Sequence, residues 1–206
     1  MKFATKNPVD LNNIPEFTGE PYVVINDNKP YFKDIDSSGT TLSWESYSDL
    51  DNLGRVGVAN ALIGRDLMPT SKRESIGQVK PSGWQLIRYD DLVNGNYLYN
   101  RSHLIAFELA GENANNKNLM TGTRYFNVTG MLPFENSVAQ YVKKTNNHVR
   151  YRVTPIFVGD ELVARGVEME AYSIEDSGRG VSFNVYVYNN QPGIEINYSD
   201  GTSRRK

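Results

Sequence analysis

The chain has 206 residues, no cysteine and a formal net charge of −2, with 22 Lys and Arg against 24 Asp and Glu. The lack of cysteine excludes disulfides, thiolate catalysis and cysteine-ligated zinc. No run approaches the ~18 apolar residues of a membrane span, so we expect no membrane segment. The length fits a single domain over residues 1–206.

The charges are unevenly distributed along the chain. Nine acidic residues and two lysines lie between Asp10 and Asp51, a local charge of −7, so the remainder carries +5. Basic residues gather in residues 65–80, in residues 143–152 and at the C-terminus. This distribution would let a polyanion meet the later part of the chain, but an ordinary solvated surface accounts for it equally well.

The acidic N-terminal part, residues 1–52, is predicted to contain one short hairpin. Residues 21–26 and 30–32 are rich in β-prone side chains, and the turn-forming residues 27–29 separate them. No low-complexity linker follows, so we assign this part to the same domain as the rest.

The next segment, residues 48–64, is predicted to be a helix. Val56, Ala59 and Ile63 would share one face, and Gly64 can end the helix. Three glycines weaken the helix propensity of this segment, so tertiary packing would have to hold it.

Residues 69–84 are predicted to form a loop, with Lys72 and Arg73 in its exposed portion. These two bases serve either solubility or contacts with backbone phosphates, and the sequence alone leaves both roles open. Trp84 follows a turn and is predicted to lie in the core rather than to stack on a ligand.

The centre of the chain combines a strand, a polar loop and a helix. Residues 94–100 mix turn residues with aromatics and are predicted to lead into a strand that ends near His103. A loop rich in Gly and Asn covers residues 111–118. A helix is predicted over residues 132–144, in which Glu135 complements the helix dipole. The core-facing residues of this helix are predicted to be Phe134, Val138, Tyr141 and Val142.

The C-terminal half alternates apolar and polar residues. Residues 149–158 and 161–172 are predicted to pair around a Gly-Asp turn, and two more strands are predicted over residues 181–188 and 194–198. The last eight residues are polar and predicted to be loose. The predicted fold is therefore α+β, a central antiparallel β-sheet with two main helices packed on it.

Four central residues have the chemistry of a metal-assisted phosphodiester hydrolase. Such an enzyme needs a base for water and positive charge for the developing oxyanion. His103 suits the base, and Arg101, on the same strand face, can bind a phosphate oxygen. Asn127 can be the single protein ligand of Mg²⁺ and Glu135 can hold the waters of the ion, provided that the segment between them is near-helical. Asn is common in this chain, so on chemistry alone the set is suggestive rather than a motif.

The same residues resemble a known family. Asn100-Arg-Ser-His103, followed by Asn118, Asn127 and Pro133-Phe-Glu135, is similar to the DNA/RNA non-specific endonucleases of the ββα-metal (His-Me finger) class. Other segments resemble the secreted DNases of streptococci within that class: residues 53–61, 67–69, 81–84 and 167–171. The resemblance implies that residues 94–145 form the ββα-metal motif.

The resemblance implies a role for each residue of the central set. His103 would be the general base that activates water, and Arg101 would contact the scissile phosphate. Asn127 would be the only direct protein ligand of Mg²⁺. Glu135 would hold the waters of the ion.

Further residues would support the site or grip the substrate. Asn100 and Asn118 would support it, and Lys72 and Arg73 would bind the nucleic acid. The usual family motif is Asp-Arg-Gly-His, so Asn100 and Ser102 depart from it. The charge missing at Asn100 bears on the rate and the pH optimum more than on the reaction.

The sequence therefore predicts a secreted, mature endodeoxyribonuclease that needs Mg²⁺, which Mn²⁺ or Ca²⁺ can replace, and leaves 5′-phosphate ends. Its partner would be DNA, the sequence leaves open whether RNA is cut as well, and no membrane or obligate protein partner is expected. The alternative is a non-catalytic module that binds nucleic acid or a surface, for which Asn100 is the best support.

Overall fold

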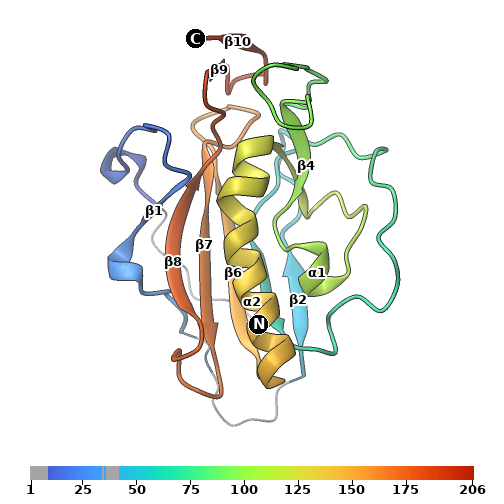
Figure 1. Ribbon diagram of the computed structural model, residues 1–206, viewed down its shortest axis with the longest axis vertical. Coiled ribbons are helices and arrows are strands. Elements are labelled where there is room, and N and C mark those ends of the chain that lie inside the picture. The colour runs from blue at the N-terminus through green and yellow to red at the C-terminus, as the bar shows by residue number, and fades with distance from the viewer. Residues whose placement is uncertain (1–8, 34, 36–41) are drawn as a thin grey trace.

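The computed structural model describes residues 9–33, 35 and 42–206. Its centre is a six-stranded antiparallel sheet in the order β1-β8-β7-β6-β3-β2 (Figure 1). The strands are β1 (Tyr22–Val24), β2 (Trp44–Tyr47), β3 (Ala59–Ile63), β6 (Val149–Ile156), β7 (Gly166–Ser173) and β8 (Ser182–Tyr188). Short 3₁₀ turns at Leu11–Asn13 (η1) and Asn26–Asn28 (η2) lie in the N-terminal part. The predicted antiparallel sheet is confirmed, and β6 pairs with β7 as predicted, but β7 begins at Gly166 and residues 161–165 belong to the connecting loop.

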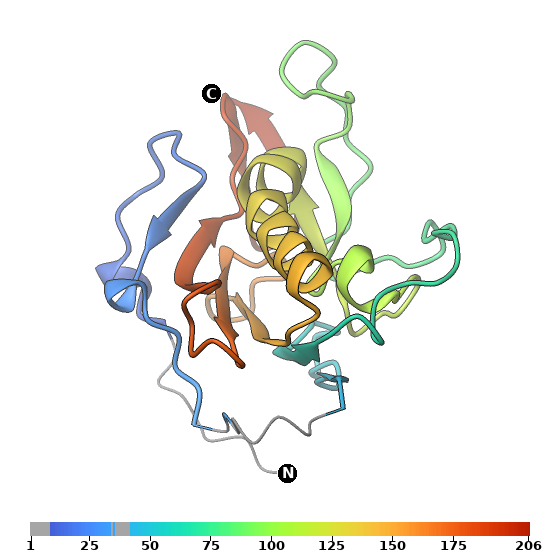
Figure 2. The ribbon, with the colours of Figure 1, turned by 60° about the horizontal axis from the view of Figure 1, so that its bottom comes forward.

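One long helix, α2 (Leu132–Thr145), lies across one face of this sheet, as Figures 1 and 2 both show. Its buried side chains include Val138, Ala139 and Val142. They join the main core with the residues of β6 that point to the same side, such as Tyr151 and Val153. The predicted helix is confirmed, because its apolar spacing gives it one face to bury.

The opposite face of the sheet buries charges instead of apolar groups. Arg150 and Arg152 of β6 are only 2% and 7% exposed. Arg152 pairs with Glu170 of β7 at 2.9 Å, and Arg150 lies between the rings of Phe32 and Trp44. Arg150 and Arg152 are therefore internal, and only Lys143 and Lys144 among the lysines and arginines of residues 143–152 are exposed.

A second, two-stranded sheet carries the central motif. β4 (Tyr99–His103) pairs antiparallel with β5 (Leu119–Thr123), so that His103 lies opposite Leu119. A single helical turn, α1 (Phe107–Ala110), follows β4, and a π-helical segment, η3 (Phe126–Met131), runs directly into α2. The predicted strand, polar loop and helix are present, and a second strand, β5, which the residue pattern did not predict, lies between the loop and the helix. The α+β class is confirmed.

Residues 48–64 are not a helix. Residues 50–58 form turns and loop, and Ala59–Ile63 form β3, a strand between β6 and β2 in which every residue is buried. The prediction correctly places the apolar residues of this segment in the core, but it assigns them to a helix instead of a strand. A strand buried on both faces needs no alternation, and the glycines disfavour a helix here.

The hairpin predicted around residues 27–29 is also wrong. β1 pairs with β8, about 160 positions later in the chain, and not with residues 30–32. Asn26, Asp27 and Asn28 all have positive φ angles and form the η2 turn. The backbone of Tyr31 instead bonds Glu170 and Arg152 on the outer face of the sheet.

The C-terminal residues are ordered rather than loose. β10 (Ser203–Arg205) pairs with β9 (Ile194–Ile196), and Arg205 forms an ion pair with Asp91 at 2.6 Å. The prediction of two main helices is wrong, because α2 is the only helix longer than six residues in the described part of the chain.

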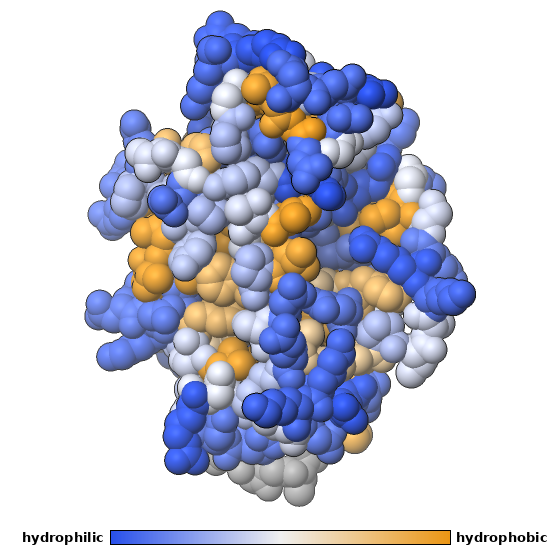
Figure 3. Space-filling view, viewed as in Figure 1, coloured by the Kyte–Doolittle hydropathy of each residue, from blue (hydrophilic) through white to orange (hydrophobic). Residues whose placement is uncertain are grey.

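The surface around α2 is mainly hydrophilic, with hydrophobic side chains in small separate groups on the visible face (Figure 3). Within the described residues no helix combines the length and the apolar character that crossing a bilayer requires.

Candidate active site

His103 ends β4 and is 6% exposed. Its Nε2 lies 3.0 Å from the carbonyl oxygen of Asn113, and its Nδ1 lies 3.4 Å from a guanidinium nitrogen of Arg73. Arginine can only donate, and a carbonyl can only accept. The imidazole is therefore protonated at Nε2, and the lone pair of Nδ1 faces Arg73, where it can accept a proton.

The surroundings of His103 favour its neutral form. Burial lowers the pKa of this imidazole below the ordinary value of 6.5, and the positive charge of Arg73 lowers it further, against the raising effect of the Asn113 carbonyl. A neutral imidazole is the form that can act as a base.

The exposed loop of residues 69–80 brings positive charge to His103. Arg73 lies over the ring of Phe107, 6.0 Å from its centroid, besides its contact with Nδ1. The loop is held by Glu74, whose backbone N–H donates to the side chain of Asn113 at 2.8 Å. Lys72 is exposed, and neither base forms an ion pair within the described part of the chain.

Asn118 is fully buried and fixes the backbone just after His103. Its side-chain oxygen accepts from the N–H of Ile105 at 2.8 Å, and its amide donates to the carbonyl of Ile105 at 2.9 Å. These two bonds join the polar loop to the end of β4, so the position of Asn118 is one of support for the site.

The other residues of the β4 motif divide between its two faces. Arg101 lies on the His103 face by strand alternation; its Nε donates to the carbonyl of Val79, and its guanidinium stacks on Trp84 at 4.0 Å. Asn100 points to the other side, and its side chain has no hydrogen bond with the described residues, His103 included.

The residue that departs from the family's glycine fits without backbone strain. Ser102 has no positive φ and is fully buried. Its hydroxyl lies where a side chain at Gly122 of β5 would be, since a Cβ there would meet the Ser102 Oγ at 2.3 Å. The position that has to be glycine is therefore Gly122 on β5, opposite the strand that carries Ser102.

The π-helical turn brings Asn127 and Glu135 to one face. The carbonyl of Asn127 accepts from the N–H of Leu132, five residues on. In a regular α-helix, residues eight apart lie about 80° from alignment, whereas one extra residue in a wide turn leaves them about 20° apart. Gly130 allows this turn to pack on β8, because a Cβ would meet the Val187 side chain at 2.5 Å.

The carboxyl group of Glu135 is buried and interacts with that of Glu108, which is half-buried. Glu135 is 5% exposed and has no hydrogen bond or ion pair with the described residues. Burial, and then the charge of Glu108, raise the pKa of Glu135 to about 8, while Arg73 opposes the shift. One oxygen of Glu108 is buried without a partner, and so is the hydroxyl of Tyr151, which interacts with both carboxyl groups.

These groups fit a hydrated divalent cation. Within the described residues no cluster of three or more His, Asp and Glu is arranged to hold a metal ion directly. The side chain of Asn127 is half-buried and has no hydrogen bond in the described part. An amide oxygen and two unpartnered carboxyl groups are the hard ligands that a cation retaining several waters needs.

The comparison with protein families decides the assignment. The model of the DNA/RNA non-specific endonuclease family matches residues 36–175. The chain belongs to this family. The search of curated proteins gave no match.

Solved nuclease structures have the same fold. NucA from Streptococcus agalactiae without metal is 26% identical, with a TM-score of 0.79 over 95% of this chain and 92% of that one. The same nuclease with a magnesium ion is 25% identical, with a TM-score of 0.79 over 95% and 93%. Sda1 nuclease with a zinc ion is 26% identical, with a TM-score of 0.73 over 97% and 100%. The predicted resemblance to streptococcal nucleases is confirmed.

Glu108, whose carboxyl group interacts with that of Glu135, was not predicted from the sequence of this nuclease. Its signal was an acidic residue inside the apolar run Phe107-Glu-Leu-Ala110, where a charge is costly unless it has a use. Of the residues proposed from the sequence, Arg73 contacts His103 directly. His103 bonds the carbonyl of Asn113 in the 111–118 loop, and Asn118 of the same loop bonds the backbone of Ile105.

We expect Glu135→Gln to remove a pH-dependent loss of stability from the metal-free nuclease. The pKa of Glu135 is higher folded, about 8, than unfolded, near 4.5. The stability that the protonated Glu135 contributes to the folded state is therefore complete below about pH 4.5 and is lost as the pH rises through about 8. The loss should be on the order of a few kcal/mol.

Thermal unfolding in EDTA at about pH 5 and about pH 9 measures this effect. The midpoint of the wild type should fall between these values by several degrees more than that of Glu135→Gln. Equal falls in both proteins would contradict the burial of an ionisable carboxyl group at this position.

Proposed function

We propose that this nuclease is a secreted, Mg²⁺-dependent endonuclease that hydrolyses the phosphodiester bonds of DNA, and also of RNA, to 5′-phosphate and 3′-hydroxyl ends. The observation that carries the proposal is the position of His103, whose Nε2 bonds the Asn113 carbonyl while its Nδ1 faces the guanidinium of Arg73. The absence of cysteine and the likeness to secreted streptococcal DNases support secretion.

In this proposal, His103 takes a proton from the attacking water. The Nε2–H bond to the Asn113 carbonyl holds the ring and directs Nδ1 to the substrate side. Burial keeps the imidazole neutral near neutral pH, so little of the enzyme is lost to the protonated form.

Arg73 and Arg101 would bind the non-bridging phosphate oxygens. Both lie near or on the strand that ends at His103, and guanidinium groups can bind phosphate with two parallel hydrogen bonds. Arg73 would turn from the imidazole to the phosphate when the substrate arrives. In this way the pair would stabilise the charge of the transition state.

Asn127 would hold the divalent cation, with Glu135 and Glu108 oriented to its waters. When bound, the cation would neutralise phosphate charge and supply an acidic water that protonates the leaving 3′ oxygen. Burial and then the charge of Glu108 raise the pKa of Glu135 in the free protein, and the positive charge of the cation would oppose both effects. The related structures of NucA and Sda1 hold magnesium and zinc, which supports a divalent cation as the cofactor.

A supercoiled plasmid tests the function. With Mg²⁺ the purified protein should nick and then linearise the plasmid, EDTA should stop the reaction, and added Mg²⁺ should restore it. The ends should accept ligation without prior phosphorylation, as 5′-phosphate ends do. Binding of the plasmid without cleavage under any divalent cation would refute the proposal and favour the non-catalytic alternative.

A further inference from the structure

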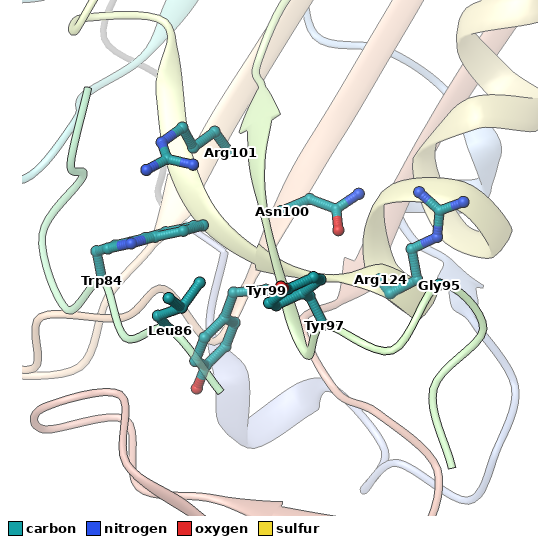
Figure 4. Close-up of a pocket in the computed structure, with 8 residues that line it drawn as sticks. All are labelled: Trp84, Leu86, Gly95, Tyr97, Tyr99, Asn100, Arg101 and Arg124. Carbon is teal, nitrogen blue, oxygen red and sulfur yellow. The ribbon is translucent and has the colours of Figure 1, made fainter. Parts of the chain in front are cut away.

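An open pocket lies beside the start of β4, away from His103. Its volume is about 410 Å³, within the usual range of small-ligand sites. Figure 4 shows Trp84 and Arg101 on one side of the β4 ribbon, and Asn100 and Arg124 on the other, with Tyr97 between them. Side chains on both sides of the start of β4, the strand that ends at His103, therefore line the pocket.

The lining of the pocket is cationic. No acidic side chain lines it. The Arg124 guanidinium has no hydrogen bond or ion pair with the described residues, and that of Arg101 has only the Val79 carbonyl and the Trp84 ring. Most arginines elsewhere in the described chain are neutralised by an acid, as Arg204 and Arg205 are. Two unneutralised guanidinium groups in one hollow suit an anion.

The same pocket presents unusual apolar surface to solvent. Tyr97 is 43% exposed and Leu86 is 77% exposed. Arg88, outside the pocket, lies over the Tyr97 ring at 5.2 Å. Flat aromatic faces combined with cations are the means by which proteins bind bases and phosphates of unpaired nucleic acid.

The position of the pocket relates it to the reaction. Arg101 lines the pocket and lies on the strand face of His103, two residues earlier, which is about 6.6 Å along a strand. Arg124 lies on the other side of β4, so a nucleic-acid chain whose scissile phosphate lies at His103 would reach Arg124 by passing Arg101 and then Tyr97 at the start of the strand.

We propose that the pocket between Tyr97 and Arg124 binds one unpaired nucleotide next to the scissile phosphate, with its base on the Tyr97 ring and its phosphate on Arg124. The inference rests on the proposed function. It makes single-stranded nucleic acid a better ligand than duplex, because a paired base is stacked within the helix and cannot lie on Tyr97.

The test measures binding without turnover. The probes are a fluorescein-labelled thymidine oligonucleotide of about 12 nucleotides and a labelled duplex of the same length, titrated by anisotropy in EDTA. The variants are Tyr97→Ala, Tyr97→Phe and Arg124→Gln. Lys144→Gln is the matched charge control, since Lys144 is exposed at the far end of α2 (Figure 1).

We expect Tyr97→Ala to weaken single-strand binding at least about fivefold, and Tyr97→Phe, which keeps the ring, to bind like the wild type. Arg124→Gln should weaken binding and reduce the slope of log K against log salt by about 0.7, the value for one phosphate contact on a single strand. Duplex affinity should change less than about twofold in Tyr97→Ala, and Lys144→Gln should match the wild type throughout.

Single-strand binding unchanged in both Tyr97→Ala and Arg124→Gln would overturn the inference, as would equal losses on the duplex. Unfolding midpoints identify a variant that fails to fold, and the second variant then decides. Plasmid cleavage by the wild type is a separate result. If it is present while these variants bind normally, the pocket assignment fails and the proposed function stands.

Discussion

Replacement of His103 by alanine is expected to lower kcat for plasmid cleavage by about 10²- to 10⁴-fold, the usual contribution of a general base. In the proposed mechanism this imidazole accepts the proton of the attacking water at Nδ1, which faces the guanidinium of Arg73. Since His103 is not proposed to bind the cation, His103→Ala should still show the rise in unfolding midpoint that Mg²⁺ gives the wild type.

The pH profile gives a second readout for His103. Because burial lowers the pKa of the imidazole in the free protein, the acid limb of kcat/KM for the wild type should have its midpoint below 6.5. The residual activity of His103→Ala should lack this limb. Undiminished cleavage by the variant, or an unchanged acid limb, would exclude His103 as the base.

Replacement of Asn127 by alanine is expected to lower cleavage at moderate Mg²⁺ by at least about 10²-fold, because the proposed site has one direct protein ligand. The side chain is half-buried at the π-helical turn and has no hydrogen bond with the described residues. Its removal should therefore cost little stability in the metal-free protein.

Calorimetric titration of Mg²⁺ separates this role from a general effect on the helix. Asn127→Ala should lose measurable Mg²⁺ binding, whereas Asn136→Ala, the same change on α2 outside the proposed site, should retain it. Together with His103→Ala, which should keep the cation and lose the reaction, the pair distinguishes base from metal ligand. Wild-type Mg²⁺ affinity in Asn127→Ala would remove Asn127 from the proposal.

The carboxyl pair of Glu108 and Glu135 gives the free nuclease a site of limited stability. Both carboxyl groups lack partners in the described residues, and burial, followed by the charge of Glu108, raises the pKa of Glu135. A protein optimised only for folding would replace such groups with apolar ones. Their presence is consistent with a function that a bound cation completes.

The sequence by itself determined the elements whose patterns are local. The α2 helix follows from apolar residues at helical spacing after Pro133, and the β6–β7 hairpin follows from alternation around a Gly-Asp turn. The end of β4 at His103 and the loop after it could also be predicted, since turn residues and aromatics mark them.

Only the tertiary structure decided the features that depend on residues far apart in the chain. β3 is a strand because β2 and β6 pair with both its edges, and β1 leaves its neighbouring segment to pair with β8. The contact of Arg73 with His103, the pairing of Glu108 with Glu135 and the pocket of Tyr97 and Arg124 each join separate segments. Local propensity carries no information on such contacts, because burial and charge at each position depend on what packs against it.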